Sequence, residues 1–273
     1  TVYLRGGTYI IHEPVVFGLK DGDTSYEAYK DEQPVISSAV PVTGWQRHKA
    51  AIWVADIPEG VADFKVMFDG NRMLERARSR GFQAPQQKFK MFATRNVARP
   101  EDRHLLKRLE FPEGAIKAWD NIEDVEVHFC GVPWTYNISP IESVDLDEGV
   151  ATLKYEGNTP PSTTPKPYNP TYVENHIDLL DQPGEWCVNT RTRKIYYWPV
   201  NGRPSQKICV PTLKEFFRIE GKINYDGPAD TPVKNLAFVG LTVTQGDRYS
   251  WWDDHKGWGI QHDWDKFDHG NAL

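Results

Sequence analysis

The sequence is poor in cysteine, in long hydrophobic runs and in positive charge, and each shortage excludes a class of protein. Its three cysteines, Cys130, Cys187 and Cys209, lack metal-ligand spacing and allow one disulfide at most. No run approaches the roughly 18 apolar residues of a membrane-spanning helix, so we expect no membrane insertion. The net charge of −6 argues against nucleic-acid binding, which favours a basic surface.

Helical periodicity is also scarce. The best helix candidate is residues 99–109, where Pro100 suits the first turn. Elsewhere, short β-branched and aromatic runs alternate with turn residues, and the 21 glycines and 20 prolines supply turns at the frequency of a strand-rich protein. Aromatic residues make up 12% of the 273 residues, which excludes a disordered chain. We therefore predict an all-β protein with helix in less than about a quarter of its residues.

The strand-like runs divide the chain into three parts, residues 1–45, 46–215 and 216–273. The short strand-like runs of the first part are residues 2–5, 8–11, 14–17, 25–29, 35–37 and 41–45. They fit two architectures about equally, one edge of a sandwich or the successive faces of a β-solenoid. The last part resumes with strands at 216–219 and 234–244.

The middle part is predicted to be antiparallel. Asp69-Gly70-Asn71 separates two strand-like runs as a hairpin turn does, and Val125, Val127 and Phe129 alternate toward one face. A second hairpin is expected to bring Trp186 and Tyr196 together across two strands, with both side chains largely buried.

The end of the chain has the most distinctive composition. Four of the ten tryptophans lie in the final 23 residues, among acids and histidines. Indole faces stack on the C–H faces of sugars, and carboxylates and imidazoles bond to sugar hydroxyls, so this segment is a candidate carbohydrate site; the alternative is a loop that anchors its tryptophans in its own domain. The candidate substrate-binding residues are Trp251, Trp252, Asp253, Asp254, His255, Trp258, His262, Asp263 and Trp264.

Other site chemistries find less support. His255, His262, Asp263 and Asp265 offer metal-ligand atoms, but no known metal motif is present, and we expect neither a metal nor a cofactor. Arg76 and Arg78 lie on one strand face, where they could grip a carboxylate or, more commonly, form surface ion pairs.

Several segments together resemble bacterial right-handed parallel β-helix glycoside hydrolases, most closely glycoside hydrolase family 141, which includes α-L-fucosidase and xylanase activities. The similar segments follow the same order in both; here they are residues 2–9, 34–37 with 44–45, 68–72 with 76–79, 181–186, 194–199 and 259–264. The resemblance implies a partial right-handed parallel β-helix in residues 1–45 and 216–273, with an inserted antiparallel β-sandwich-like domain in residues 46–215.

The same resemblance implies an exported enzyme that cleaves plant or algal polysaccharide or oligosaccharide linkages with two carboxylates. The chain begins in a strand without initiator Met or signal peptide, and we interpret it as a fragment whose catalytic residues are expected beyond Leu273. The alternatives are a non-catalytic carbohydrate-binding or adhesive β-helix protein, and a polysaccharide lyase.

Overall fold

The computed structural model describes residues 1–84, 104–130, 136–157, 160–161, 170–224, 227, 229–248 and 258–259. In this part of the chain the regular elements are strands, together with short 3-10 turns that include η1 (Leu19–Asp21), η3 (Ile122–Asp124) and η4 (Ile177–Leu179). The prediction of an all-β protein is confirmed. Among the described residues, no helix has the length and apolar character needed to cross a membrane.

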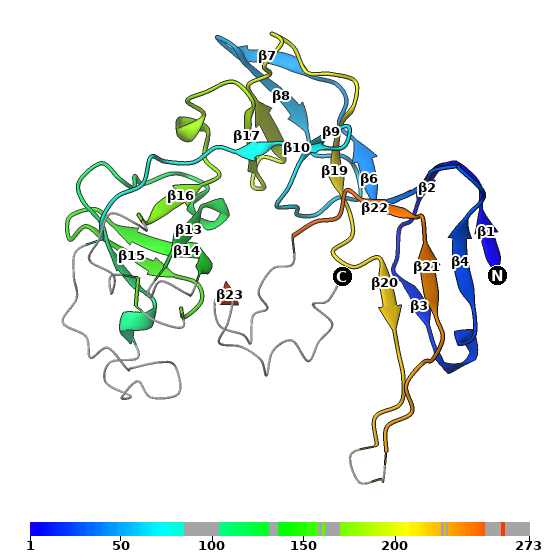
Figure 1. Ribbon diagram of the computed structural model, residues 1–273. Helices are drawn as coiled ribbons and strands as arrows, with labels where there is room; N and C mark the ends of the chain where they lie inside the picture. Colours follow the sequence, from blue (N-terminus) through cyan, green and yellow to red (C-terminus); the bar gives the residue numbers. More distant parts are fainter. Residues whose placement is uncertain are drawn as a thin grey trace.

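Strands from the two ends of the chain pair with each other in parallel (Figure 1). Three ladders result: β1 (Val2–Leu4), β4 (Ser25–Ala28) and β21 (Ala237–Val239); β2 (Gly7–Ile10), β5 (Pro34–Ser37) and β22 (Thr242–Thr244); and β3 (Val15–Phe17) with β20 (Phe217–Ile219). The chain passes through the ladders in turn. It forms β1, β2 and β3 on the first passage, β4, β5 and β20 on the second, and β21 and β22 on the third. The chain thus leaves this parallel part after β5 and returns at β20.

Aromatic rings stabilise the parallel part from within. The Phe17 ring lies with its centroid 5.2 Å from that of Tyr26 and 5.1 Å from that of Phe238, and Phe217 stacks on Phe238 at 5.0 Å. These rings come from β3, β4, β20 and β21, so strands separated by the whole middle of the chain share one apolar contact.

Successive turns of the parallel part also repeat a backbone feature. Asp23 lies two residues before β4 with φ of 55°, and Asn235 lies two residues before β21 with φ of 56°. Asp and Asn tolerate this left-handed conformation better than other residues that carry a side chain. The Asn235 Nδ2 donates to Asp23 Oδ1 at 2.6 Å, so the two turns are directly bonded.

The middle of the chain forms three mainly antiparallel sheets. The four-stranded sheet contains β10 (Arg72–Met73), β9 (Phe68–Asp69), β19 (Ile208–Pro211) and β6 (Ala39–Pro41). The five-stranded sheet contains β11 (Glu75–Arg76), β17 (Glu185–Asn189), β18 (Lys194–Tyr197), β8 (Ile52–Asp56) and β7 (Gln46–Lys49). The six-stranded sheet contains β12 (Arg108–Glu110), β15 (Val150–Leu153), β14 (Asn137–Asp145), β13 (Glu126–Phe129), β16 (Tyr172–Glu174) and β23 (Trp258–Gly259).

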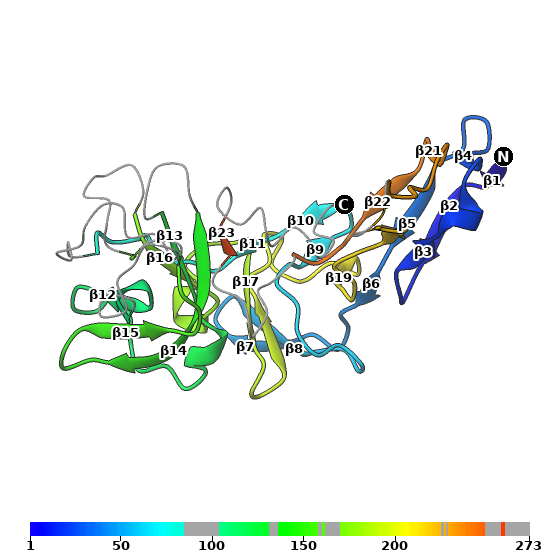
Figure 2. The same cartoon turned by 90° about the horizontal axis from the view of Figure 1, so that it is seen from below.

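The molecule is elongated, as Figure 2 shows. The parallel strands lie at one end, the six-stranded sheet lies at the other, and the two smaller antiparallel sheets lie between them. Two large cores and a smaller cluster lie in the described middle of the chain. One core surrounds Trp186, which stacks on Phe64 at 5.5 Å, the other contains Val125, Val127 and Phe129, and the small cluster contains Ala77, Leu180 and Cys187.

Two local predictions differ from the structure. Trp186 is fully buried, but its partner across the strands is Tyr197; Tyr196 pairs with Cys187 and is only half-buried. A shift of one residue reverses the face of a strand, so the aromatic pairing was assigned to the wrong tyrosine. The predicted helix at 99–109 is found only as a 3-10 turn at residues 104–106 within its described part; residues 108–110 form β12, because Leu109 is buried against β15.

Asn175 joins the five- and six-stranded sheets. Its Nδ2 donates to the backbone oxygens of Asp124 and Val188 at 2.9 and 3.1 Å, and its Oδ1 accepts from the Val188 N–H at 2.8 Å. Asn175 itself has φ of 75° and is 1% exposed. One side chain therefore satisfies three buried backbone groups, two of Val188 in the five-stranded sheet and one of Asp124 in η3, just before β13 of the six-stranded sheet.

We expect Asn175→Ala to lower the free energy of unfolding by about 3 kcal/mol, because it leaves those groups without partners in the interior. Urea denaturation measures this change. The exposed Asn201→Ala serves as control and should change the free energy by less than about 0.5 kcal/mol. If the two variants unfold at the same urea concentration, the role given to Asn175 is contradicted.

Candidate functional site

The candidate residues at the end of the chain lie almost wholly outside the described residues. This applies to Trp251, Trp252, Asp253, Asp254, His255, His262, Asp263 and Trp264. The backbone of Trp258 is described: it belongs to β23 and pairs with Ile138 of β14. The chain therefore returns, after the parallel part, to the six-stranded sheet.

Ile138 borders a pocket of about 440 Å³ that contains the most unusual group of charges in the described chain. The sequence places this group by strand alternation. On β13, Val127 and Phe129 belong to the apolar core, while Glu126 and His128 are also buried. On the adjacent β16, Glu174 lies opposite Glu126, and Tyr172 lies opposite His128.

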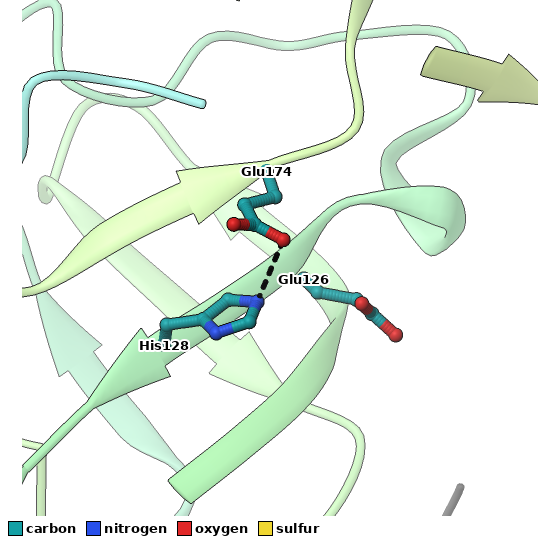
Figure 3. A group of neighbouring side chains, drawn as sticks. All are labelled: Glu126, His128 and Glu174. Atoms are coloured by element: carbon teal, nitrogen blue, oxygen red, sulfur yellow. Dashed lines mark ion pairs between the residues drawn. The ribbon is translucent and has the colours of Figure 1, made fainter. Parts of the chain in front are cut away.

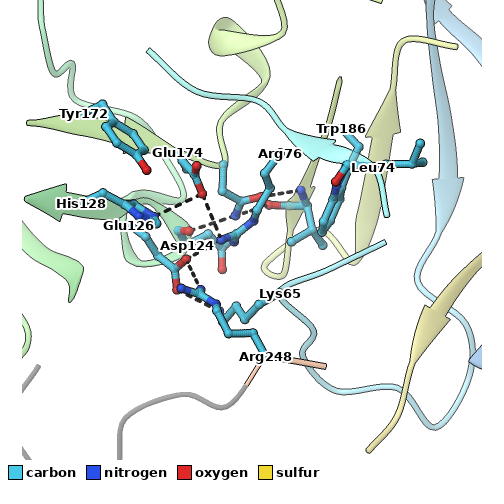
Figure 4. Close-up of polar contacts among 12 residues, drawn as sticks. Lys65, Leu74, Arg76, Asp124, Glu126, His128, Tyr172, Glu174, Trp186 and Arg248 are labelled. Carbon is cyan, nitrogen blue, oxygen red and sulfur yellow. Dashed lines mark hydrogen bonds and ion pairs between the residues drawn. The ribbon is translucent and has the colours of Figure 1, made fainter. Parts of the chain in front are cut away.

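Two carboxylates directly opposite each other on neighbouring strands repel, and cations from elsewhere in the chain offset this repulsion. Arg76 of β11 donates from Nη1 to Glu126 Oε2, and the same oxygen accepts from Arg248 Nη2 at 2.6 Å. The Lys65 Nζ lies 3.7 Å from Glu126 Oε1. Figure 4 shows these three cations converging on Glu126 from different segments.

Glu174 has a different set of partners. Its Oε2 lies 3.2 Å from His128 Nε2, as Figure 3 shows, and 4.0 Å from Arg76 Nη1. The other nitrogen of His128, Nδ1, is 3.0 Å from the hydroxyl of Tyr136, which is also hydrogen-bonded to the hydroxyl of Tyr172. The imidazole lies flat against the Tyr172 ring with 4.8 Å between centroids.

These contacts keep both carboxylates ionised. Burial by itself raises the pKa of Glu126, but the charges of Arg76, Lys65 and Arg248 outweigh it and hold that pKa far below its usual range. Burial likewise raises the pKa of Glu174, and the hydrogen bond and charge of His128 with the charge of Arg76 bring it below its ordinary value. A proton donor in catalysis must be protonated at the working pH, so neither glutamate fits that role.

Glu126, His128 and Glu174 each offer a metal-ligand atom, and these atoms lie within 4.8 Å of one another. A divalent cation among them would also lie beside Arg76, Lys65 and Arg248, whose positive charges already compensate Glu126. The group fits an ion-pair network better than a metal site.

The two arginines noted in the sequence have separate environments. The Arg76 side chain is 6% exposed and its pairs are buried, so it is not a surface ion-pair residue. Arg78 is exposed, and its guanidinium lies 5.5 Å from the centre of the Tyr172 ring. Both border the same pocket.

Sequence reasoning missed Glu126, His128 and Glu174. The signal available to it was the run of residues 125–129, in which charged and apolar residues alternate within a strand that is buried on both faces. Nothing in that run identifies Glu174 or Arg76 as partners, because strand pairing and sheet contacts bring them together across long stretches of chain.

A larger hollow of about 910 Å³, bordered by loop residues such as Pro58 and Glu59, contains no comparable buried charges.

Two comparisons with known proteins found similarity to this chain. A family model described as "GH141 insertion domain" matches residues 152–200. A solved structure titled "Glycoside hydrolase" is similar to this chain with a TM-score of 0.66 and 22% sequence identity; the match covers 90% of this chain and 43% of that one. The chain thus spans less than half the length of that structure, and the likeness concerns the fold. Among curated proteins, none matches.

The ion-pair network predicts a specific dependence of stability on pH. The folded-state pKa of Glu126 lies below its ordinary value near 4.5, so its contribution to stability is present above about pH 4.5 and is lost as pH falls toward the folded pKa. At pH 7, Glu126→Gln should lower the free energy of unfolding by about 3–5 kcal/mol, because Arg76 then remains buried without its counter-charge. Denaturant titrations from pH 3 to pH 7 should show the difference from wild type shrinking as pH falls.

Glu142→Gln provides the matched control, since Glu142 pairs with Lys107 at 3.2 Å on the surface. It should change the free energy of unfolding by at most about 1 kcal/mol at every pH. A difference between wild type and Glu126→Gln that stays constant down to pH 3 would refute the depressed pKa.

Proposed function

We propose that this chain is part of a glycoside hydrolase that acts on plant or algal polysaccharide or oligosaccharide linkages. The observation that carries the proposal is the parallel pairing of β20–β22 with β3–β5 on either side of a long insertion, together with the match of residues 152–200 to a model of the GH141 insertion domain. The similar solved structure titled "Glycoside hydrolase" supports the same function.

In this proposal the parallel part is the start of a right-handed parallel β-helix, formed by residues 1–45 and 216–273, and residues 46–215 are an inserted β-sandwich-like domain. The three parallel ladders support stacked coils, because each ladder adds one strand for each passage of the chain. The insertion would then replace a short turn between the second and third strands of the second coil.

The proposed chemistry uses two carboxyl groups, one that protonates the leaving oxygen and one that acts as nucleophile or as base toward water. Glu126 and Glu174 are close enough together to suggest such a pair, but their cationic partners keep them ionised. We therefore assign the acid and the base to other residues, in coils beyond Leu273, and propose that the tryptophans and aspartates of residues 251–264 contact the sugar beside them. Such an enzyme would be exported to reach its polysaccharide.

A carbohydrate-binding protein without catalysis is the second candidate function. It is favoured by the same ionised carboxylates, since neither can serve as the carboxylic acid that two-carboxylate hydrolysis needs. Hydrolysis assays separate the two functions.

We expect residues 1–273 alone to hydrolyse neither an aryl α-L-fucoside nor an aryl β-xyloside, and a longer polypeptide that continues past Leu273 to hydrolyse at least one of them. Each well-placed acid or base contributes about 10²–10⁴-fold to the rate, so the loss of both leaves little turnover. Release of the aryl group at equal protein concentration gives the comparison.

Comparable turnover by the two polypeptides would place the catalytic carboxylates within residues 1–273 and overturn this assignment. Asp→Asn variants at positions 253, 254, 263 and 265 would then identify them. Inactivity of both polypeptides, combined with sugar binding, would favour the carbohydrate-binding function.

A further inference from the structure

The side chains that border the pocket of about 440 Å³ beside Arg76 include more cations than carboxylates. Arg76, Lys65 and Arg248 surround two buried carboxylates, those of Glu126 and Glu174. Asp63 and Glu75 are exposed to solvent and therefore partly screened, although Asp63 pairs with Lys65 at 3.1 Å and Asp247 accepts the Lys65 backbone N–H.

Arg78 adds a further cation at the same pocket. Within the described part of the chain it forms no ion pair, and its guanidinium lies over the Tyr172 ring. A guanidinium on an aromatic face keeps its N–H groups at the ring edge available to an incoming acceptor.

The interior also contains hydrogen-bond donors without acceptors. The Nε and Nη2 of Arg76 are buried and have no hydrogen-bond partner, and the same is true of Glu126 Oε1; the Arg76 side chain is 6% exposed and borders the pocket. Buried donors are normally satisfied, so these nitrogens leave the Arg76 guanidinium with unused hydrogen-bonding capacity beside the pocket. The planar fork of a guanidinium matches the two oxygens of a carboxylate or a sulfate.

We propose that this pocket binds an acidic sugar unit of a glycan, with the carboxylate or sulfate substituent directed at Arg76, Arg78 and Arg248. The hydroxyl groups of Tyr136 and Tyr172 supply polar contacts for the sugar, and Met73 and Ile138 supply an apolar wall. The volume falls within the range of about 300–1,000 Å³ typical of small-ligand sites. The inference deepens the proposed function and depends on it only in taking the ligand to be a carbohydrate.

The test is calorimetric titration of the whole chain with three matched trisaccharides: one of galacturonic acid, its methyl ester, and an O-sulfated galactose trisaccharide. We expect the galacturonate or the sulfated sugar to bind at least about tenfold more tightly than the neutral ester, because a charge-assisted hydrogen bond is lost in the ester. Affinity for the acidic sugar should fall as sodium chloride is raised.

Arg78→Gln tests the pocket without disturbing the buried pairs, since Arg78 is exposed. It should weaken binding of the preferred acidic sugar about tenfold, and Arg78→Lys should restore only part of the loss, because it restores the charge but not the planar fork. Arg80→Gln, an exposed arginine two residues along the chain that does not border the pocket, should leave the affinity unchanged.

Preference for the carboxylate or for the sulfate identifies which anionic substituent the pocket takes, and either supports the inference. Equal affinity for the acid and its methyl ester, or equal losses in Arg78→Gln and Arg80→Gln, overturns it. Because binding is measured without turnover, tight binding of acidic sugars with no hydrolysis by the longer polypeptide would reject the proposed enzyme while leaving the pocket established.

Discussion

The ion pair between Arg76 and Glu126 is the contact on which the arrangement of the molecule depends most. Arg76 belongs to the five-stranded sheet, Glu126 belongs to the six-stranded sheet, and Arg248 reaches the same carboxylate from the segment that follows the parallel strands. Three parts of the chain therefore meet at one buried carboxylate. The energetic consequence is asymmetric: a buried pair adds little net stability when intact, whereas removal of one partner is costly because the other charge stays buried.

The same junction is supported by neutral contacts close to the parallel part. The Gln245 Nε2 donates to the backbone oxygen of Gly70 at 2.7 Å, and the backbone oxygen of Gln245 accepts from Ser38 Oγ at 2.9 Å. Asp247 then accepts the Lys65 backbone N–H at 2.8 Å. Successive residues after β22 are thus fixed to the middle sheets, and this fixes the direction in which Arg248 enters the pocket.

The sequence was informative where short-range physics decides the structure. Asp69-Gly70-Asn71 predicted a hairpin, and β9 and β10 pair with Asp69 opposite Arg72. The short runs before residue 38 likewise became strands, because alternation and turn residues are local properties. The same alternation could not select Tyr197 over Tyr196, since two adjacent aromatic residues offer both faces of one strand.

The pocket lay beyond this kind of reasoning for a physical reason. Its residues come from β11, β13, β16 and the segment after β22, and each is an ordinary charged or aromatic residue in its own stretch of sequence. Only sheet pairing reveals that Glu126 and Glu174 are opposite each other, and only burial reveals that their charges must be compensated.

A site designed only for stability would be simpler than this one. Apolar residues of similar volume at Arg76 and Glu126 would avoid the desolvation of two charges, and such replacements are often neutral or stabilising. The protein instead gathers Arg76, Lys65 and Arg248 around Glu126 at the edge of the pocket and leaves two Arg76 nitrogens without acceptors. An anionic ligand is the partner that the excess of cations bordering the pocket favours. The carboxylates then act as supports that hold the guanidinium groups in position, which is consistent with their being ionised and with their exclusion as proton donors.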